Sequence, residues 1–401
     1  MTALATAPPE TDDATVAALA HQLLEELPPK ATDPVTFLGR QFDLGLAWVH
    51  APVGCGGLGV SPGLQRTSNE ILYGAGAPVA AFRNVIGHGM GAPTIITHGT
   101  EAQKRRYLRP LFTGEEVWCQ LFSEPGAGSD VAGLSTKAVL DGEEWLVNGQ
   151  KVWTTLAHLA KWGMLVARTD PEQPKHKGMT YFVVDMEAPG VEVRPLFQIT
   201  GEAEFNEVYF TDVRIPDAER LGDVGEGWHV TLTTLMNERV AIGGGIPAKG
   251  AGFIGEAVKV WHDTGRPDAV RKDALMALWV RAEVLRLTNI RASHLRAGGT
   301  PGPEGSIGKA MSADLNKDIS AFTVGLLGAE GMLKPGGYPM ERPKHAMLWA
   351  NPQQAFLRAR ANSIEGGTTE IAKNILGERV LGLPGDVRND KDVPWSQVPR
   401  S

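Results

Sequence analysis

The chain has 401 residues, 42% of them hydrophobic and 21% charged, which is ordinary for a globular protein of two or three domains. Its formal net charge of −7 argues against nucleic-acid binding, and its two cysteines, Cys55 and Cys119, show neither metal-ligand spacing nor a disulfide framework. No apolar run approaches the roughly 18 residues of a membrane span, and the N-terminus lacks the layout of a signal peptide. We therefore expect a cytoplasmic protein without a membrane span and without a metal site.

Helical patterns open the chain. Residues 1–13 are typical of a frayed tail, and apolar residues at helical spacing then predict a helix from Asp13 to about Leu27, which Pro28 and Pro29 stop. A further helix is expected over residues 102–111, ended by Thr113 and Gly114. Residues 1–116 are therefore expected to form an N-terminal helical domain.

The pattern changes to short β-strands at about Val117. Turn signals such as Asp141-Gly142 and Pro189-Gly190 separate these strands at short intervals, which favours a small β-barrel or sandwich over residues 117–224. The clearest predicted strands are residues 145–147, 151–153, 163–167, 180–184 and 207–210.

Long helical patterns return after Gly227 and persist to about Leu381. Two loops rich in Gly and Pro interrupt them, at residues 298–305 and 334–339. A C-terminal helical bundle is thus expected over residues 225–385, followed by a polar tail over 386–401 that is extended or packed on a neighbouring molecule. The fold class is α+β, with the order helices, strands, helices.

Two motifs suggest chemistry. Residues 122–130 read Phe-Ser-Glu-Pro-Gly-Ala-Gly-Ser-Asp, a loop that brings backbone N–H groups and hydroxyls close to a flat or anionic ligand. Residues 148–155 place a tryptophan and two threonines on a strand. Each motif alone could be a routine glycine turn or a hairpin with a core tryptophan. Together, within a chain of helical, β and helical parts, they resemble the flavin-binding middle domain of the acyl-CoA dehydrogenase family.

The resemblance covers nearly the whole chain and implies FAD as the cofactor. Ser123, Trp153 and Thr155 match residues that contact the flavin ring, which needs an aromatic wall and hydrogen-bond donors at its polar edge. Gly128 and Ser129 match the loop near the acyl-CoA or the flavin phosphates. Phe122 stands where the family usually has an aliphatic residue, and it would offer its backbone to the flavin.

A second glycine-rich segment, residues 325–331, looks like the one that receives the ADP part of FAD from a neighbouring subunit. Gly325 and Gly328 would allow close approach to the pyrophosphate, although Gly325 replaces the glutamine that often opens this motif. Arg266 matches the arginine that meets the FAD pyrophosphate across the dimer. The alternative for residues 325–331 is a helix end with a turn. The resemblance implies a homo- or hetero-oligomer, built as a dimer of dimers.

The catalytic base is ambiguous between two glutamates. Glu238 precedes Arg239, as in the isovaleryl-CoA and long-chain branch of the family, whereas Glu365 lies one residue before the usual C-terminal base position, which Gly366 occupies. We favour Glu238 as the base and keep Glu365 as the runner-up. Glu238 could instead be a solvated partner of Arg239, and Glu365 a polar loop residue.

The remaining family roles follow from the same register. The Gly366 N–H would bind the thioester carbonyl, Thr368 would serve the flavin, and Arg239 and Ser129 would contact substrate. Three consecutive glycines, residues 243–245, favour close helix packing or room for a bulky acyl chain.

The resemblance implies a FAD-dependent α,β-dehydrogenation of an acyl-CoA. The α-proton goes to a glutamate, the β-hydride goes to flavin N5, and the electrons pass on to an electron-transfer flavoprotein. Two alternatives remain, a subunit that only completes the flavin site of a heteromer, and an oxygen-using flavoenzyme of the same fold. A role in lipid metabolism follows, but a fatty acyl chain and a steroid-like acyl group both stay open.

Overall fold

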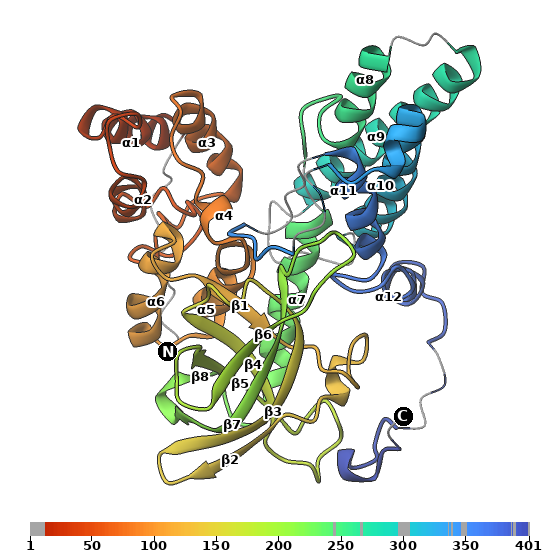
Figure 1. Cartoon of the computed structure of the whole chain (residues 1–401). Helices are drawn as coiled ribbons and strands as arrows, with labels where there is room; N and C mark the ends of the chain where they lie inside the picture. Colours follow the sequence, from red (N-terminus) through yellow and green to blue (C-terminus); the bar gives the residue numbers. More distant parts are fainter. Residues whose placement is uncertain are drawn as a thin grey trace.

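The structure is a computed structural model that describes residues 13–243, 246–264, 268–295, 305–335, 337, 340–345, 351–385, 387 and 390–399. Along the chain, one group of helices is followed by a β-sheet and then by a second group of helices (Figure 1). The two helical groups stand beside each other on the same side of the sheet, and helix α7 runs from the sheet into the second group. The α+β class and the three-part order expected from the sequence are confirmed.

The N-terminal group consists of short helices. They are α1 (Asp13–Glu26), α2 (Pro34–Asp43), α3 (Gln65–Gly74), α4 (Ala80–Arg83), α5 (Ala92–His98) and α6 (Glu101–Thr113), with a π-helical turn at Gly87–Gly91 before α5. The helix predicted from Asp13 ends one residue early, at Glu26. The helix predicted over 102–111 is α6, and Gly114 ends it with a left-handed φ of 74°.

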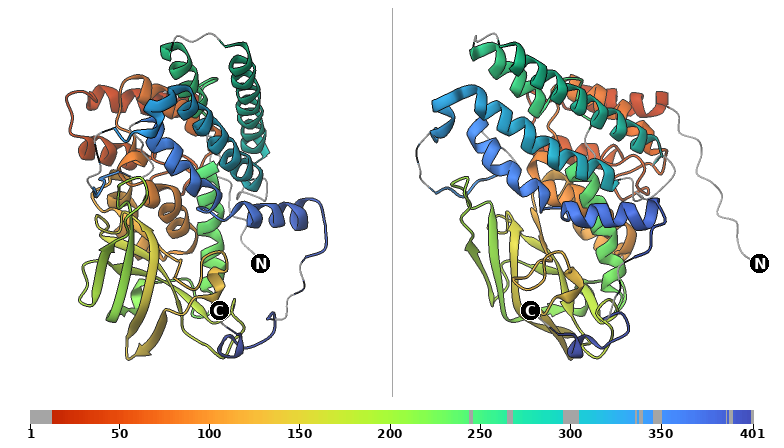
Figure 2. Two further views of the ribbon diagram at one scale, coloured as in Figure 1. Left: turned by 45° about the vertical axis from the view of Figure 1, so that its right-hand side comes forward. Right: turned by 90° about the vertical axis from the view of Figure 1, so that its right-hand side faces the viewer.

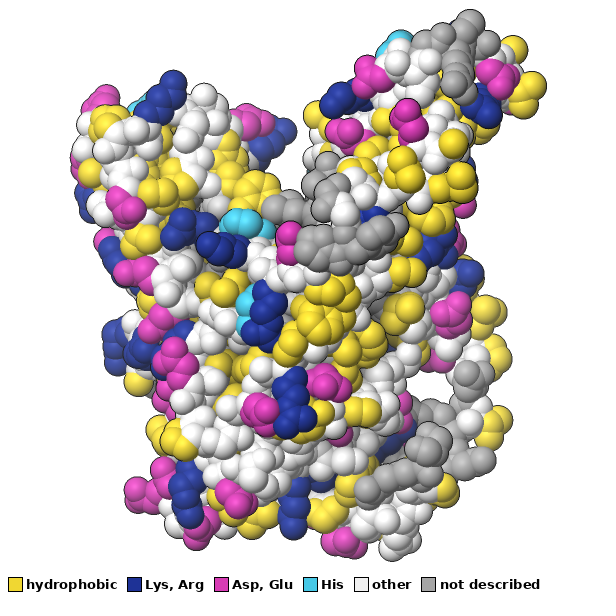
Figure 3. All heavy atoms as spheres, in the orientation of Figure 1, with side chains coloured by type: hydrophobic (Ala, Val, Ile, Leu, Met, Phe, Trp, Pro, Cys, Tyr) yellow, Lys and Arg dark blue, Asp and Glu magenta, His cyan; other side chains and the backbone are white. Residues whose placement is uncertain are grey.

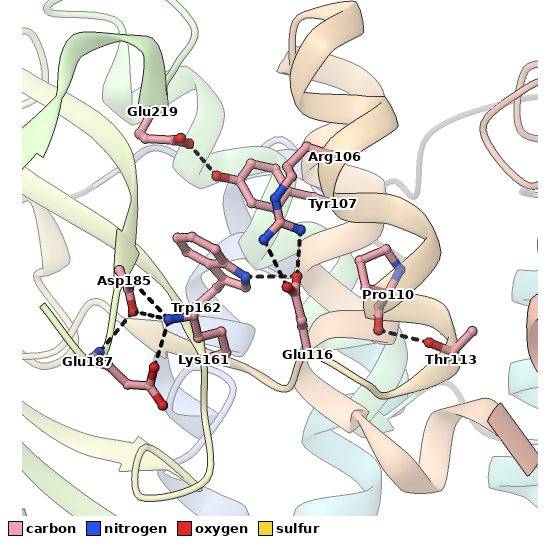
Figure 4. A network of polar contacts seen from close by, with 10 residues as sticks. All are labelled: Arg106, Tyr107, Pro110, Thr113, Glu116, Lys161, Trp162, Asp185, Glu187 and Glu219. Atoms are coloured by element: carbon pink, nitrogen blue, oxygen red, sulfur yellow. Dashed lines mark hydrogen bonds and ion pairs between the residues drawn. The ribbon is translucent and has the colours of Figure 1, made fainter.

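Helix α6 is fixed to the sheet by a polar network (Figure 4). The Arg106 guanidinium forms two hydrogen bonds to the Glu116 carboxylate, at 2.9 and 2.8 Å, and the Trp162 indole N–H donates to the same carboxylate at 2.9 Å. The Tyr107 hydroxyl donates to Glu219. These bonds tie α6 to the start of the strand at Trp162 and to the turn at Glu219.

The described strands form an eight-stranded sheet of order β6-β7-β3-β2-β4-β5-β8, in which β1 pairs in parallel with β4. Two segments predicted as separate strands, 145–147 and 151–153, belong to one twelve-residue strand. The strands are β1 (Trp118–Leu121), β2 (Lys137–Asp141), β3 (Glu144–Thr155), β4 (Trp162–Arg168), β5 (Met179–Asp185), β6 (Val191–Pro195), β7 (Phe205–Pro216) and β8 (Arg220–Leu221).

The sheet has a hydrophobic core on each face, and its central strands β4 and β5 are buried on both. One face packs with the N-terminal helices and α7 in a core that includes Tyr107, Trp118 and Tyr181, and the other face has its own core with Trp145 and Phe182. In β3 and β7 burial alternates, so these strands contribute to the core with Trp145 and Phe182 and have their other face less buried. The sheet is therefore a rigid support for the loops at its rim.

Helix α7 (Gly227–Gly243) is held where the three parts of the chain meet. The Thr234 hydroxyl lies 2.9 Å from the Thr94 hydroxyl of α5 and 3.1 Å from the Tyr181 hydroxyl of β5, and all three residues are buried. A Cβ at Gly89 would lie 3.2 Å from the Ala241 Cβ, so the π-helical turn approaches α7 closely. Of the three consecutive glycines singled out in the sequence, Gly244 and Gly245 lie outside the described residues.

The C-terminal helices pack around α10, whose start contacts α7 and whose length contacts α8 and α9 (Figure 2). They are α8 (Phe253–Thr264), α9 (Ala269–Leu295), α10 (Gly305–Leu327), α11 (Pro352–Arg358) and α12 (Thr369–Ile375). Within the described part of the chain, no helix is long and apolar enough to cross a membrane.

The end of the chain returns to the sheet. Residues 390–399 lie against loops at the rim of the sheet, and Trp395 is buried there, whereas the sequence led us to expect a tail that is extended or packed on a neighbour. The difference comes from the burial of Trp395 together with backbone hydrogen bonds and an ion pair between this segment and the loop after β4.

Candidate active site

The two motifs singled out in the sequence lie side by side. The loop of residues 122–130 follows β1, and the Val152 N–H of β3 donates to the Ser123 carbonyl at 2.9 Å. Ser123 is partly exposed at this junction, and the Phe122 ring is buried against Tyr181, with 5.8 Å between the ring centroids. Phe122 is only 3% exposed, so a contact between its backbone and a flavin stays a prediction.

A buried ion pair that sequence reasoning missed holds the two motifs together. Lys151 is fully buried, and its Nζ donates to Glu124 Oε1 at 2.8 Å and to the Phe122 carbonyl at 3.0 Å. The Ser135 and Thr136 N–H groups also donate to the Glu124 carboxylate. Burial alone would raise the pKa of Glu124, but the Lys151 ammonium and these hydrogen bonds lower it.

Trp153 stands out from the strand because the backbone is irregular there. The β3–β7 register shifts between Lys151 and Thr154, and Trp153 has a φ of 60°, which is uncommon for a residue other than glycine. As a result 57% of Trp153 is exposed, with its ring edge against Phe205. Thr155 follows on the same strand and is partly exposed.

The glycine-rich part of the first loop offers open space. Glu124 and Ala127 close a tight turn through two backbone hydrogen bonds of 3.0 Å. A Cβ built at Gly126 or at Gly128 would have no heavy atom of the described chain within 4 Å. Ser129 is exposed beside them. A ligand could thus reach the backbone of this loop without displacing a side chain.

Glu238 lies on α7, partly buried, and its Oε2 accepts a hydrogen bond from the Gln120 Nε2 of β1 at 3.1 Å. Burial raises the pKa of Glu238, and the negative charge of Glu365 raises it further, whereas the Gln120 hydrogen bond and the Arg239 and Lys309 charges oppose this. Such an environment makes a carboxylate a better proton acceptor. Gln120 carried no recognisable signal in the sequence.

Arg239 and Lys309 are the cations of this region. Arg239 is partly buried, and burial lowers its pKa against the effect of Glu238. Lys309 is 1% exposed at the start of α10, and its Nζ donates to the Asn362 carbonyl at 2.9 Å. Lys309 was missed in the sequence because it stands in a helix without any motif.

Glu365, the runner-up for the base, is held in an ion pair. Its two carboxylate oxygens accept hydrogen bonds from Arg358 at 3.1 and 2.8 Å, and Asn362 donates to Oε1 at 2.7 Å. The Arg358 side chain is 5% exposed and also lies 3.7 Å from Glu204. The Glu365 carboxylate is thus held by an arginine and an asparagine, whereas the Glu238 carboxylate is held by the Gln120 amide.

The segment after Glu365 forms a tight turn into α12. Gly366 and Gly367 have left-handed φ values of 65° and 87°, which side chains disfavour. Thr368 then caps α12 by accepting the Ile371 N–H at 3.2 Å. Gly366 directly follows Glu365, whose charge acts on Glu238.

The residues predicted to receive the ADP part lie elsewhere. Gly325 and Gly328 are exposed at the end of α10, sixteen and nineteen residues beyond Lys309, or about 24 Å or more along a helix. Gly328 has a φ of 61° and begins a 3₁₀ turn, Gly328–Met332. Arg266 lies outside the described residues. No cluster of potential metal ligands occurs among the residues the structure describes.

Comparison with known proteins identifies the family. Sequence models of the acyl-CoA dehydrogenase N-terminal, middle and C-terminal domains match residues 14–115, 119–213 and 225–381. The chain is 41% identical over 343 residues to acyl-CoA dehydrogenase FadE34 of Mycobacterium tuberculosis, which covers 85% of this chain and 45% of that protein. It is 36% identical to acyl-CoA dehydrogenase IpdE1 of the same organism, over 86% of each protein. The chain thus spans less than half of the length of FadE34.

Solved structures agree with this. The ChsE4-ChsE5 complex of M. tuberculosis matches with a TM-score of 0.69 and 27% identity, over 96% of this chain and 100% of that chain. The Tcur3481-Tcur3483 steroid ACAD matches with a TM-score of 0.69 and 26% identity, over 93% and 97% of the respective chains. From its sequence and its fold, the chain belongs to the acyl-CoA dehydrogenase family of oxidoreductases.

Proposed function

We propose that the chain catalyses the FAD-dependent α,β-dehydrogenation of an acyl-CoA thioester, with Glu238 as the base. The observation that carries this assignment is the contrast between the two glutamates. Glu365 is neutralised by Arg358, whereas Glu238 has an amide partner, Gln120, and a raised pKa. An α-proton needs an acceptor whose pKa lies close to the working pH, and the raised pKa of Glu238 moves it in that direction.

The residues around the two motifs fit FAD. Trp153 offers an exposed aromatic face, Ser123 a hydroxyl and a backbone N–H, and Thr155 a second hydroxyl, all on supports held by the Lys151–Glu124 pair. Thr368 adds a hydroxyl from the C-terminal helices. Bound FAD supplies the acceptor for the hydride that leaves the β-carbon.

The substrate roles belong to this chain's own side chains and backbone. Glu238 would accept the α-proton on a carboxylate oxygen, and Gln120 would keep that carboxylate oriented. The Gly366 N–H would bind the thioester carbonyl and so make the α-proton more acidic. Arg239 would contact the substrate beside the base.

Two features support an oligomer in which one FAD contacts two subunits. The exposed Gly325–Gly328 end of α10 is far along the helix from the base region, so the two FAD-binding segments of one chain would serve different cofactors. One relative of known structure is a complex of two different chains, ChsE4 and ChsE5, and a heteromer is therefore our second candidate assembly. An electron-transfer flavoprotein as acceptor follows from the family resemblance.

The acyl group is proposed from the relatives alone. A protein 26% identical to this chain is described as a steroid acyl-CoA dehydrogenase, so a steroid-like acyl-CoA is the first substrate class to test. Fatty acyl-CoAs of different lengths are the comparison.

The decisive experiment compares Glu238→Gln with Glu365→Gln. Glutamine keeps the shape of the side chain but cannot accept the proton, so Glu238→Gln should reduce the rate of flavin bleaching by acyl-CoA by about 10⁴-fold or more, the upper end for a general base. Glu365→Gln should cost much less. Anaerobic stopped-flow absorbance measures both, and the flavin released from each variant should be FAD.

The outcome can go against the proposal in two ways. A dead Glu365→Gln beside an active Glu238→Gln would move the base to the C-terminal turn. Full activity in both variants, or the release of FMN, would remove the dehydrogenase mechanism as proposed.

A further inference from the structure

Residues 390–399, named here the strap, return from the C-terminal helices to the rim of the sheet (Figures 1 and 2). The backbone N–H of Trp395 donates to the Gln173 carbonyl at 2.9 Å, and the backbone N–H of Ser396 donates to the Pro171 carbonyl at 2.8 Å. Pro394 forms a β-bridge with Pro174. The strap is thus joined by its backbone to the loop that connects β4 and β5.

The Trp395 side chain joins that loop to the glycine-rich one. Its indole ring lies 4.8 Å from the centre of the Arg168 guanidinium, and the indole N–H donates to the Gly133 carbonyl at 3.4 Å. Arg168 in turn donates to the Lys175 carbonyl at 2.8 Å and to the Ala132 carbonyl at 2.6 Å. Both residues are buried, so Trp395 covers the guanidinium that links the two loops.

The second tie is a lysine shared by two carboxylates. The Lys175 Nζ donates to Asp130 at 2.8 Å and forms an ion pair with Asp390 of the strap. Burial opposes the charge on Lys175, but the two carboxylates outweigh it and raise the pKa of this lysine. The Lys175 side chain is 10% exposed, and its partners Asp130 and Asp390 are 59% and 26% exposed.

Asp130 ends the loop whose glycines have open space beside them. Gly126 and Gly128 leave their backbone accessible, and Ser129 directly precedes Asp130. Such a loop suits a phosphate group, provided that its backbone is held in one conformation. The strap is connected to Asp130 through Lys175 and to Ala132 through Arg168.

We propose that the strap holds residues 125–130 in the conformation that binds the diphosphate of a nucleotide-bearing ligand. FAD and acyl-CoA both contain this group, and the proposal rests on the function proposed above. Asp390 and Trp395 are then positioning residues, since they act through Lys175 and Arg168 and touch no ligand themselves.

The test compares Asp390→Asn with Asp392→Asn. Both variants remove one negative charge from the strap, but Asp392 is exposed and Asp390 contacts Lys175. Loss of loop order should weaken ligand binding by roughly three- to tenfold in Asp390→Asn, which corresponds to the ordering of one side chain or two. Asp392→Asn should bind as the unaltered protein does, and Asp390→Glu should recover most of the affinity.

Two titrations distinguish the ligands. FAD is titrated into the flavin-free protein, and coenzyme A into the FAD-loaded protein. A change in FAD affinity assigns the loop to the flavin diphosphate, and a change in coenzyme A affinity assigns it to the substrate diphosphate. Under saturating ligand, kcat should be unchanged, which a general loss of structure would not permit.

Trp395→Ala should weaken binding of the same ligand more than Asp390→Asn does. Trp395→Phe should retain part of the affinity, because the phenyl ring still covers Arg168. If the affinities of Asp390→Asn and Trp395→Ala for both ligands equal those of the unaltered protein, the strap has no such role. If the unaltered protein binds neither FAD nor coenzyme A, the proposed function fails and the strap proposal fails with it.

Discussion

Glu238 shows how one carboxylate is prepared for proton abstraction by its neighbours. Burial and the Glu365 charge favour its protonated form, and Gln120, Arg239 and Lys309 favour the ionised form. The balance lies toward a raised pKa. Because the ionised carboxylate is the base, kcat/KM should rise with pH through this raised pKa, and the acidic limb should lie above the range of an ordinary glutamate.

This balance gives a paired prediction. Lys309→Met removes a positive charge that favours ionised Glu238, so the acidic limb should move to higher pH. Glu365→Gln removes a negative charge that opposes ionisation, and it leaves the positive Arg358 beside the site, so the limb should move to lower pH. The pH dependence of kcat/KM for each variant measures the shift.

Opposite shifts are required here. Shifts in the same direction would mean that the variants act through a structural change, and unmoved limbs would mean that another group titrates. Lys317→Met is a matched control, because Lys317 lies on the same helix but pairs with Asp314 at 3.0 Å.

For individual residues, the sequence was informative where the functional residues are neighbours in the chain. Glu238 and Arg239 are adjacent, and the order of Glu365, Gly366 and Thr368 can be read directly. The partners of these residues could not be predicted, because Gln120 is 118 positions from Glu238 and the Lys309 amine meets Asn362 across 53 positions. Only the folded arrangement of α7, β1 and α10 brings them together.

Strand β3 carries the clearest discrepancy between pattern and structure. Its alternating residues predicted two short strands, and the structure has one strand with register shifts after Val147 and after Lys151. The alternation of hydrophobic residues reports which side chains are buried, but a bulge depends on pairing with β7, which the sequence of β3 alone does not contain. The bulge is what turns Trp153 outward.

The Lys151–Glu124 pair should therefore govern both stability and flavin binding. Lys151→Met leaves the Glu124 carboxylate buried and without its cation, which should lower the free energy of unfolding by about 3–5 kcal/mol. The same substitution removes the hydrogen bond from Lys151 to the Phe122 carbonyl, which helps to position the loop, so FAD affinity should fall. Urea unfolding of the flavin-free protein and FAD titration measure the two effects separately.

The double variant Lys151→Met with Glu124→Gln separates these two roles. Neutralising both partners should restore part of the stability, because no unpaired charge remains. FAD affinity should stay low, since the Phe122 carbonyl is still unsupported. Recovery of both quantities together would contradict a positioning role for Lys151.

For the whole molecule, the three-part order of helices, sheet and helices could be predicted from the spacing of hydrophobic residues. This spacing has a period of 3.6 in helices and 2 in strands, and each period persists over many residues. The return of the strap to the sheet could not be predicted, since it depends on a site built from Arg168, Lys175 and Gly133 in other parts of the chain. Figure 3 shows that hydrophobic side chains also remain on the surface, both on the sheet face and along the C-terminal helices.

One exposed apolar stripe is regular enough to predict assembly. On α9, Met276, Val280, Val284 and Leu287 are 43–60% exposed, and their spacing of three and four residues places them on one face of the helix. The buried residues of α9, Leu275 and Leu278 among them, face the other C-terminal helices. A stripe of this kind on a long helix is typical of a surface that another subunit covers.

We therefore expect Val280→Lys to reduce the size of the particle, because a lysine in the middle of a subunit interface places an unpaired charge there. Ala274→Lys is the matched control, since Ala274 is exposed on the same helix but away from the stripe. Light scattering measures the mass of both. If one FAD contacts two subunits, loss of that contact should also lower FAD retention in Val280→Lys alone. An oligomer of unaltered mass in Val280→Lys would show that α9 lies outside the interface, and a monomer that keeps all of its FAD would show that each subunit completes its own cofactor site.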